Sequence, residues 1–248
     1  MTTKQYVDSP INEALCDFQF FPPREWDMTI PGLIYEKVRG NFPKKKQQYG
    51  LGIQFKPMQN GIEQKVENAP PKMQFFSEDN RRAIQVGKEN LTINCFKPYE
   101  SWHSFEPVIT NNFEVYKEVA EPKGLKRIGL RYINQINTGS NLVKLEEYFR
   151  FYPYVPNDLP QEHGNFLTRI EMPFSHNRDI MILAMGSALS PDGKVSIILD
   201  IDYIMEKEQG IKLDETKKWL ENAHTEIENV FEKCITEKCR DLFGGLKA

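Results

Sequence analysis

The stretch LKRIGLRYINQI, residues 125–136, decides the fold. In this stretch Arg127 and Arg131 alternate with three apolar side chains, those of Ile128, Leu130 and Tyr132. Successive side chains of a β-strand point to opposite faces, so this alternation predicts a half-buried strand. One face of the strand is expected to be apolar and the other basic.

The opening stretch INEALCDFQFF, residues 11–21, shows the same alternation, with the acids Glu13 and Asp17 on its polar side. A shift of 114 positions superimposes the two stretches, and it places Ala14, Cys16 and Phe18 on Ile128, Leu130 and Tyr132. We interpret this match as a tandem duplication. The expected halves are residues 1–122 and 123–248, joined in one continuous globular unit.

Turn residues divide the rest of the chain into short strands and amphipathic helices. Helical spacing predicts a helix beginning near Pro31, long helices over residues 100–119 and 214–242, and a short helix over residues 142–149. The intervals between expected strands contain Gly, Asn, Pro and Asp, which are typical of turns. Further strands are expected at residues 50–55, 72–76, 82–86, 91–96, 165–172, 180–188 and 195–203.

The two long helices share one pattern of apolar spacing, with neighbouring positions three or four residues apart. Positions with this spacing lie on one helix face, so we expect both faces to cover the same sheet. The residues expected to be buried there are Phe105, Ile109, Phe113, Leu220, Ala223, Ile227 and Phe231.

The expected fold class is therefore α+β, an extended antiparallel sheet with two long helices on one face. Each half has the order β-α-β-β-β(-β)-α, in which the bracketed strand is the additional one of the first half. This order resembles the TATA-box-binding-protein-like fold, in which two pseudo-symmetric halves join their sheets and leave one face open. The likeness concerns topology, and a fold does not determine a function.

The composition excludes several classes of protein. The 248 residues are 40% hydrophobic and 12% aromatic, which is too apolar for a disordered chain. No apolar run reaches the roughly 18 residues of a membrane-spanning helix, and the N-terminus lacks the apolar segment of a signal peptide. The four cysteines and four histidines lack the spacing of a zinc site. We expect a cytoplasmic protein without a membrane partner.

The net charge of −3 does not favour nucleic acid, yet basic residues gather between residues 122 and 145, where no acid occurs. These residues are Lys123, Lys126, Arg127, Arg131 and Lys144. Two interpretations stay open. Arg127 and Arg131 could line a phosphate track, or they could pair with Glu13 and Asp17 where the halves meet.

A second candidate binding surface is the segment FRFYPYV, residues 149–155. Phe149, Arg150, Tyr152 and Tyr154 combine aromatic rings with a cation, and such surfaces stack bases or peptides. Burial of the segment beneath a loop is the alternative.

Two aspartates suggest an enzymatic alternative. Asp200 and Asp202 are two residues apart on an expected strand, so both carboxylates point to one face. Together with Glu171 they could hold Mg²⁺ or Mn²⁺, as in a metal-dependent nuclease or phosphotransfer enzyme. The competing interpretation is that they form the solvated side of the strand.

No motif supports nucleotide chemistry or a covalent nucleophile, because the sequence contains no GxxxxGK[ST], GxGxxG or GxSxG. We therefore expect no cofactor. His224 and Trp219 could be a general base and a stacking platform, but a surface or capping histidine is the more common case. Trp102, followed by His103, is interpreted as a core residue.

Four motifs, in this order, resemble one protein family. They are PINEA at residues 10–14, GLRYIN at 129–134, LDID at 199–202 and FExxIT at 231–236. Together they resemble a sporadically distributed, uncharacterised bacterial family of about this length, over most of the chain. The resemblance implies no activity, and a patchy distribution is associated with accessory roles such as phage defence.

The sequence therefore favours a non-enzymatic recognition or adaptor protein of a bacterial accessory system, which binds a protein or nucleic-acid partner. The apolar face of the C-terminal helix could pair with a second copy of the chain, giving a homodimer. A metal-dependent enzyme that uses Asp200 and Asp202 is the alternative.

Overall fold

The computed structural model describes residues 5–21, 26–27, 29–58, 61–140, 143–161, 164–189, 193–207 and 210–246, with backbone alone for residues 49–71 and 189. The described chain forms an α+β fold around one antiparallel sheet of nine strands. In sheet order the strands are β2 (Lys44–Met58), β3 (Gly61–Phe76), β4 (Arg82–Val86), β5 (Asn90–Phe96), β1 (Ile11–Phe21), β6 (Gly124–Asn137), β9 (Val195–Met205), β8 (Asp179–Leu189) and β7 (Leu167–Phe174).

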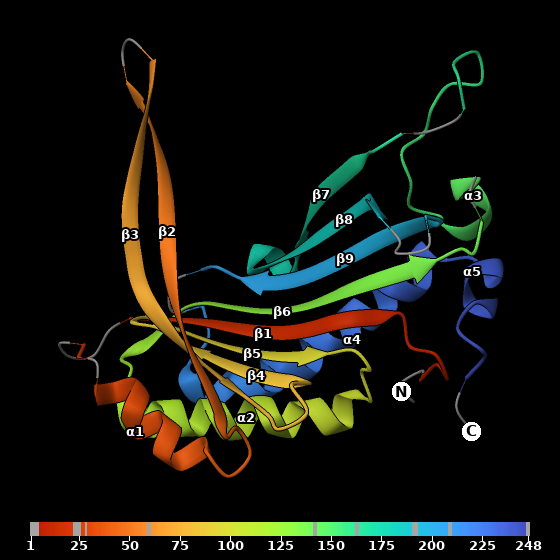
Figure 1. The fold of residues 1–248 in the computed structure, drawn as a ribbon. Coiled ribbons are helices and arrows are strands. Elements are labelled where there is room, and N and C mark those ends of the chain that lie inside the picture. The colour runs from red at the N-terminus through yellow and green to blue at the C-terminus, as the bar shows by residue number, and fades with distance from the viewer. Residues whose placement is uncertain are drawn as a thin grey trace.

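The helices lie mainly on one side of this sheet (Figure 1). They are α1 (Thr29–Val38), α2 (Trp102–Ala120), α3 (Leu145–Tyr148), α4 (Thr216–Cys234) and α5 (Glu237–Asp241), with 3-10 turns η1 (Ser175–Asn177) and η2 (Leu213–Glu215). Both α2 and α4 contain 19 residues. In the part of the chain that is described, no helix is long and apolar enough to cross a membrane.

The centre of the sheet is the antiparallel pair of β1 and β6, the two strands that the sequence pattern singles out. Cys16 lies opposite Leu130, and the register continues with Phe18 opposite Ile128 and Ala14 opposite Tyr132. From this pair the sheet grows outward on both sides, because β5 pairs with the far edge of β1 and β9 with the far edge of β6.

The core fills the space between the sheet and the helices. Phe113 of α2 stacks on Phe18 of β1, with ring centroids 4.8 Å apart. Six of the seven helix residues predicted to be buried are buried, and Phe231 is the exception. Phe231 is only half-buried because it lies at a cavity rim, where it packs against Tyr6 and Phe243.

Two predicted elements differ from the observed ones. The predicted helix over residues 214–242 is interrupted at Ile235, whose extended backbone ends α4, and the Thr236 hydroxyl then caps α5. The predicted strand over residues 50–55 is part of a much longer hairpin of β2 and β3, which extends beyond the rest of the sheet (Figure 1). The prolines at 70 and 71 fall where the register shifts, a place where a strand tolerates proline.

Candidate functional site

The face of the sheet opposite α2 and α4, called here the open face, carries the two predicted arginines. Arg127 Nη1 donates to Asp17 Oδ2 at 2.7 Å, and its Nη2 and Nε atoms lie 3.6 Å from Asp202 Oδ2 and 3.5 Å from Glu206 Oε1. Arg131 Nε donates to Asp200 Oδ1 at 2.8 Å. Each arginine is therefore held by carboxylates from neighbouring strands.

Gly129 makes room for this arrangement. A Cβ atom at this position would lie 3.2 Å from both Nη atoms of Arg127 and 3.2 Å from Ile204 Cγ2. The absence of a side chain lets the Arg127 guanidinium lie across the strand towards Asp17. Glycine inside a strand often marks such a close approach.

The carboxylates of the open face differ in their electrostatic environment. Burial raises the pKa of Asp202 to about 6, although Arg127 and Arg131 act in the opposite direction. The pKa of Arg131 is raised, chiefly by its hydrogen bond with Asp200. Asp202 therefore depends on the nearby cations to stay ionised at neutral pH.

The predicted pairing between the two central strands is confirmed for Asp17 and Arg127. Glu13 does not take part in it, because its carboxylate accepts from Asn94 Nδ2 at 2.7 Å. Lys126, another member of the basic cluster, pairs with Glu89 at 2.6 Å. The arginines of the predicted phosphate track are thus already neutralised by acids of the same sheet.

The predicted metal-binding set does not assemble. Glu171 lies on β7, two strands away from Asp202, and its carboxylate pairs with Arg169 at 2.6 Å. Asp200 is bound by Arg131. Within the described ranges no group of three or more His, Cys, Asp or Glu residues could hold a metal ion.

The aromatic segment that begins at Phe149 is divided between core and surface. Phe149 is 1% exposed and forms a β-bridge with Ile235, and the Arg150 backbone N–H donates to Cys234 O at 2.7 Å. Tyr152 is half-buried against the core, whereas Tyr154 is 74% exposed. Phe149 is therefore unsuited to a stacking surface, because it anchors the segment to the junction of α4 and α5.

Trp219 is also structural rather than a stacking platform. Its Nε1 atom donates to Asp179 Oδ1 at 3.2 Å, and Tyr203 and Arg178 donate to the same fully buried carboxylate. Burial raises the pKa of Asp179, but these hydrogen bonds outweigh burial and the net pKa is lowered. A buried charge with this many donors belongs to the framework of the fold.

The helix side of the sheet contains a cavity of about 810 Å³, called here the interhelix cavity. It lies between the N-terminal segment, the start of α2 and the second half of α4, and Tyr132 of β6 also lines it. His224 of α4 is buried beside it, with its ring stacked on Trp102 at a centroid distance of 4.4 Å. The interpretation of His224 as a surface or capping residue is therefore wrong.

A chain of polar groups runs from the core to this cavity. The hydroxyl oxygens of Tyr99 and Tyr132 are 3.2 Å apart, and the Tyr132 hydroxyl is 2.9 Å from His224 Nδ1. The other ring nitrogen, His224 Nε2, is buried without a hydrogen-bond partner among the described residues and lies 3.4 Å from Glu228 Oε1. His224 therefore links the tyrosine pair to a carboxyl group at the cavity.

Burial shifts the pKa values of His224 and Glu228 in the directions that favour the neutral form of each group. It lowers the pKa of His224 to about 4, and burial together with the nearby Glu232 raises the pKa of Glu228 to about 7. Between these two values the imidazole and the carboxyl group are both neutral. Shifts of this size in a cavity are typical of functional sites.

The two shifts predict opposite pH dependence of stability. The stabilising contribution of His224 is present above pH 6.5 and is lost as the pH falls towards 4. The stabilising contribution of Glu228 is present below pH 4.5 and is lost as the pH rises through 7. When the pH is lowered from 6.5 to 4.5, the free energy of unfolding of His224→Gln should rise by about 2 kcal/mol relative to that of wild type. That of Glu228→Gln should fall by about 2 kcal/mol relative to wild type over the same range. Urea titrations at several pH values measure this. Parallel profiles for the two variants would contradict the assignment.

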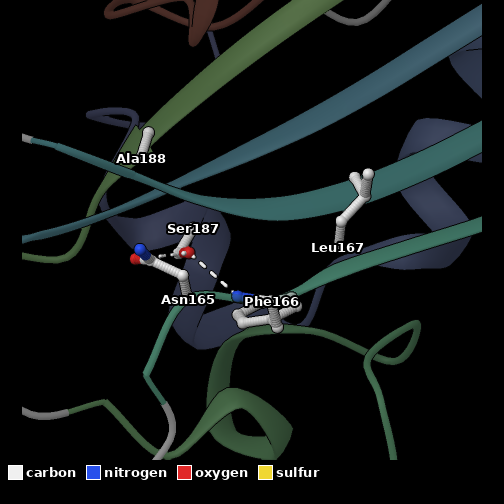
Figure 2. Close-up of a pocket in the computed structure, with 5 residues that line it drawn as sticks. All are labelled: Asn165, Phe166, Leu167, Ser187 and Ala188. Carbon is white, nitrogen blue, oxygen red and sulfur yellow. Dashed lines mark hydrogen bonds between the residues drawn. The ribbon is translucent and has the colours of Figure 1, made fainter.

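A second, smaller depression of about 490 Å³ lies where β7 begins beside β8 (Figure 2). Ser187 Oγ accepts from the Phe166 backbone N–H at 3.1 Å and donates to Asn165 Oδ1 at 3.4 Å. No titratable side chain lines it among the residues described. It offers no catalytic or charged group, so the interhelix cavity is the better-equipped site.

No local sequence pattern connects the groups around this cavity. The alternation in residues 125–136 places Tyr132 on the apolar face of its strand, and neither Tyr99 nor Glu228 belongs to a recognisable motif. The available signal was the spacing of His224 and Glu228, which places both on one helix face.

No protein-family model matches the sequence, and no curated protein has significant similarity to it. One similar solved structure is described as Methanococcus jannaschii TBP, with 10% sequence identity over 88% of this chain and 97% of that chain. The TM-score of this match is 0.25, which is too low to support an argument about fold or function.

Proposed function

We propose that this chain is a non-enzymatic recognition or adaptor protein of a bacterial accessory system such as phage defence, and that its open face binds a protein partner. One observation carries the proposal. The face presents half-buried apolar side chains among paired charges, and protein interfaces likewise place apolar side chains within a polar rim. The apolar members are Leu15, Ile133, Ile182 and Ile198.

The charges of the open face favour protein over nucleic acid. A phosphate backbone is bound by cations that release counterions, and this requires Lys or Arg side chains available to phosphate. Arg127 and Arg131 are instead engaged by Asp17, Asp200 and Asp202. A phosphate approaching either arginine would meet these carboxylates, whose repulsion opposes binding.

We further propose that the chain is a tandem duplication of halves 1–122 and 123–248, arranged as in the TATA-box-binding-protein-like fold. Cys16 and Leu130, which the 114-residue shift aligns, lie opposite each other in the central strand pair. A two-fold axis between two antiparallel copies of one strand requires such self-pairing. Both halves also begin with a strand that pairs with the last strand of the same half.

The proposal is tested by substitutions on the open face. The purified protein would be used as bait to capture candidate partners from its host. The affinity of each purified candidate would then be measured by calorimetry for wild type and for the double variant Leu15→Lys/Ile133→Lys. Charges buried in an interface without partners weaken binding strongly, so at least a tenfold loss of affinity is expected. Leu33→Lys is the matched control, because Leu33 is 52% exposed on α1.

Gln19→Lys serves as a milder variant should the double substitution lower the thermal midpoint, because Gln19 is already exposed on the same face. Duplex and single-stranded DNA would be titrated in low salt in parallel. A partner that binds the double variant as tightly as wild type would contradict the proposed surface. Salt-dependent DNA binding that Arg127→Ala weakens would restore the phosphate track.

A further inference from the structure

The interhelix cavity is lined by many acids. Its five glutamates are Glu100, Glu106, Glu221, Glu228 and Glu232. Neither Lys nor Arg occurs among the lining residues that the structure describes. Carboxylates gathered around one space repel each other and create a strongly negative potential there.

Not all of this charge is compensated by neighbouring residues. Three of the five glutamates pair with basic residues outside the lining: Glu100 with Arg82, Glu106 with Lys217 and Glu232 with Arg240. Glu221 accepts a hydrogen bond from Trp102 Nε1 at 3.1 Å, which is a neutral donor. Glu228 has no Lys or Arg within 4.0 Å in the described chain, and its nearest basic group is the uncharged His224.

His224 supplies an independent observation that points to a ligand. Its side chain is 6% exposed, and its Nε2 atom faces Glu228 without a hydrogen-bond partner among the described residues. When the Tyr132 hydroxyl donates to Nδ1, the imidazole proton sits on Nε2, which lies 3.4 Å from Glu228 Oε1 without forming a hydrogen bond to it. A small rotation that brings this N–H into hydrogen-bond geometry with the carboxylate would stabilise the ionised form that a bound cation requires.

Five aromatic residues also line the cavity: Tyr6, Tyr99, Trp102, Tyr132 and Phe231. Aromatic faces attract organic cations, and a cavity of about 810 Å³ lies within the size range of small-molecule sites. We propose that the interhelix cavity binds a small aliphatic amine, with its ammonium group on Glu228 and its methylene chain against the aromatic rings. His224 is the positioning residue for that carboxylate.

Proton release provides a specific signature of this pairing. The charged and titratable groups that face Glu228 are Glu232 and His224 on its own helix, Tyr132 on β6 and Tyr99 before α2. The carboxyl group of Glu228, with its pKa of about 7, is protonated at pH 6, so an amine that binds it must displace the proton. At pH 8 the group is already ionised and little proton release is expected.

The test is isothermal calorimetry with spermidine at pH 6 and pH 8, in two buffers with different ionisation enthalpies. Wild type is expected to bind spermidine and to release about one proton per amine at pH 6. Glu228→Gln, which removes the charge but keeps the shape, should bind at least tenfold more weakly and release none. Glu226→Gln is the matched control, because Glu226 lies on the same helix but does not line the cavity.

A short acetylated peptide with one lysine forms a second arm, because a lysine side chain presents the same ammonium group. Binding of the peptide but not of spermidine would identify a partner's lysine as the source of the cation. No binding of either probe, equal binding by Glu228→Gln, or equal competition by Mg²⁺ at matched charge would overturn the proposal. His224→Gln should lower affinity at pH 6 more than at pH 8, whereas a purely structural role would lower both equally.

Discussion

Arg127→Ala is expected to lower the free energy of unfolding by about 3–5 kcal/mol, the cost of leaving buried charges without their partner. The guanidinium lies within 4 Å of Asp17, Asp202 and Glu206, and its side chain is only 20% exposed. Alanine removes the cation from β6 but leaves Asp17 of β1 on one side of this strand and Asp202 of β9 and Glu206 on the other. Their repulsion and incomplete hydration both act against the folded state.

Urea titration at pH 7 measures this loss, and Arg131→Ala is the matched control on the same strand. Arg131 is 39% exposed and pairs with Asp200, so its removal should cost about 1 kcal/mol or less. The loss for Arg127→Ala should shrink at pH 5, because Asp202, with a pKa of about 6, is then protonated. Equal losses for the two variants would show that Arg127 does not organise the open face.

The parts of the fold that sequence analysis predicted well are those set by local periodicity. The alternation in residues 11–21 predicts β1 with its observed bounds, and the helical spacing identifies the buried faces of α2 and α4. The pairing of Asp17 with Arg127 was predictable for a related reason. Once two strands alternate and face the same way, the register between them determines which charges meet.

Features that depend on distant parts of the chain were not predictable in this way. His224 and Tyr132 are 92 residues apart, and their contact exists only because α4 packs across β6. A histidine on an amphipathic helix carries no local sign of burial when its partners come from another element. Phe149 presents the opposite case. Its aromatic neighbours in the sequence indicate an exposed binding surface, whereas its β-bridge with Ile235 buries it.

Phe113→Ala is expected to cost about 3–5 kcal/mol, the range for removing a buried phenylalanine and leaving a cavity. Phe113 is 3% exposed and stacks on Phe18 at 4.8 Å and on Phe20 at 6.1 Å. These contacts join α2 to β1, the strand at the centre of the sheet. The cavity left by alanine would lie between rigid layers that cannot collapse to fill it, so the cost should fall in the upper part of this range.

Phe231→Ala is the control for Phe113→Ala, because Phe113 and Phe231 occupy equivalent positions in the apolar patterns of α2 and α4. A difference between the two losses of stability therefore comes from packing and not from the helical pattern. Phe231 is half-buried at the rim of the interhelix cavity, so its truncation exposes side chains to water instead of creating a closed void. Its loss should therefore be about 1–2 kcal/mol in the same urea titration. A loss below about 1 kcal/mol for Phe113→Ala, or a larger loss for Phe231→Ala, would mean that α2 does not pack on β1 as described.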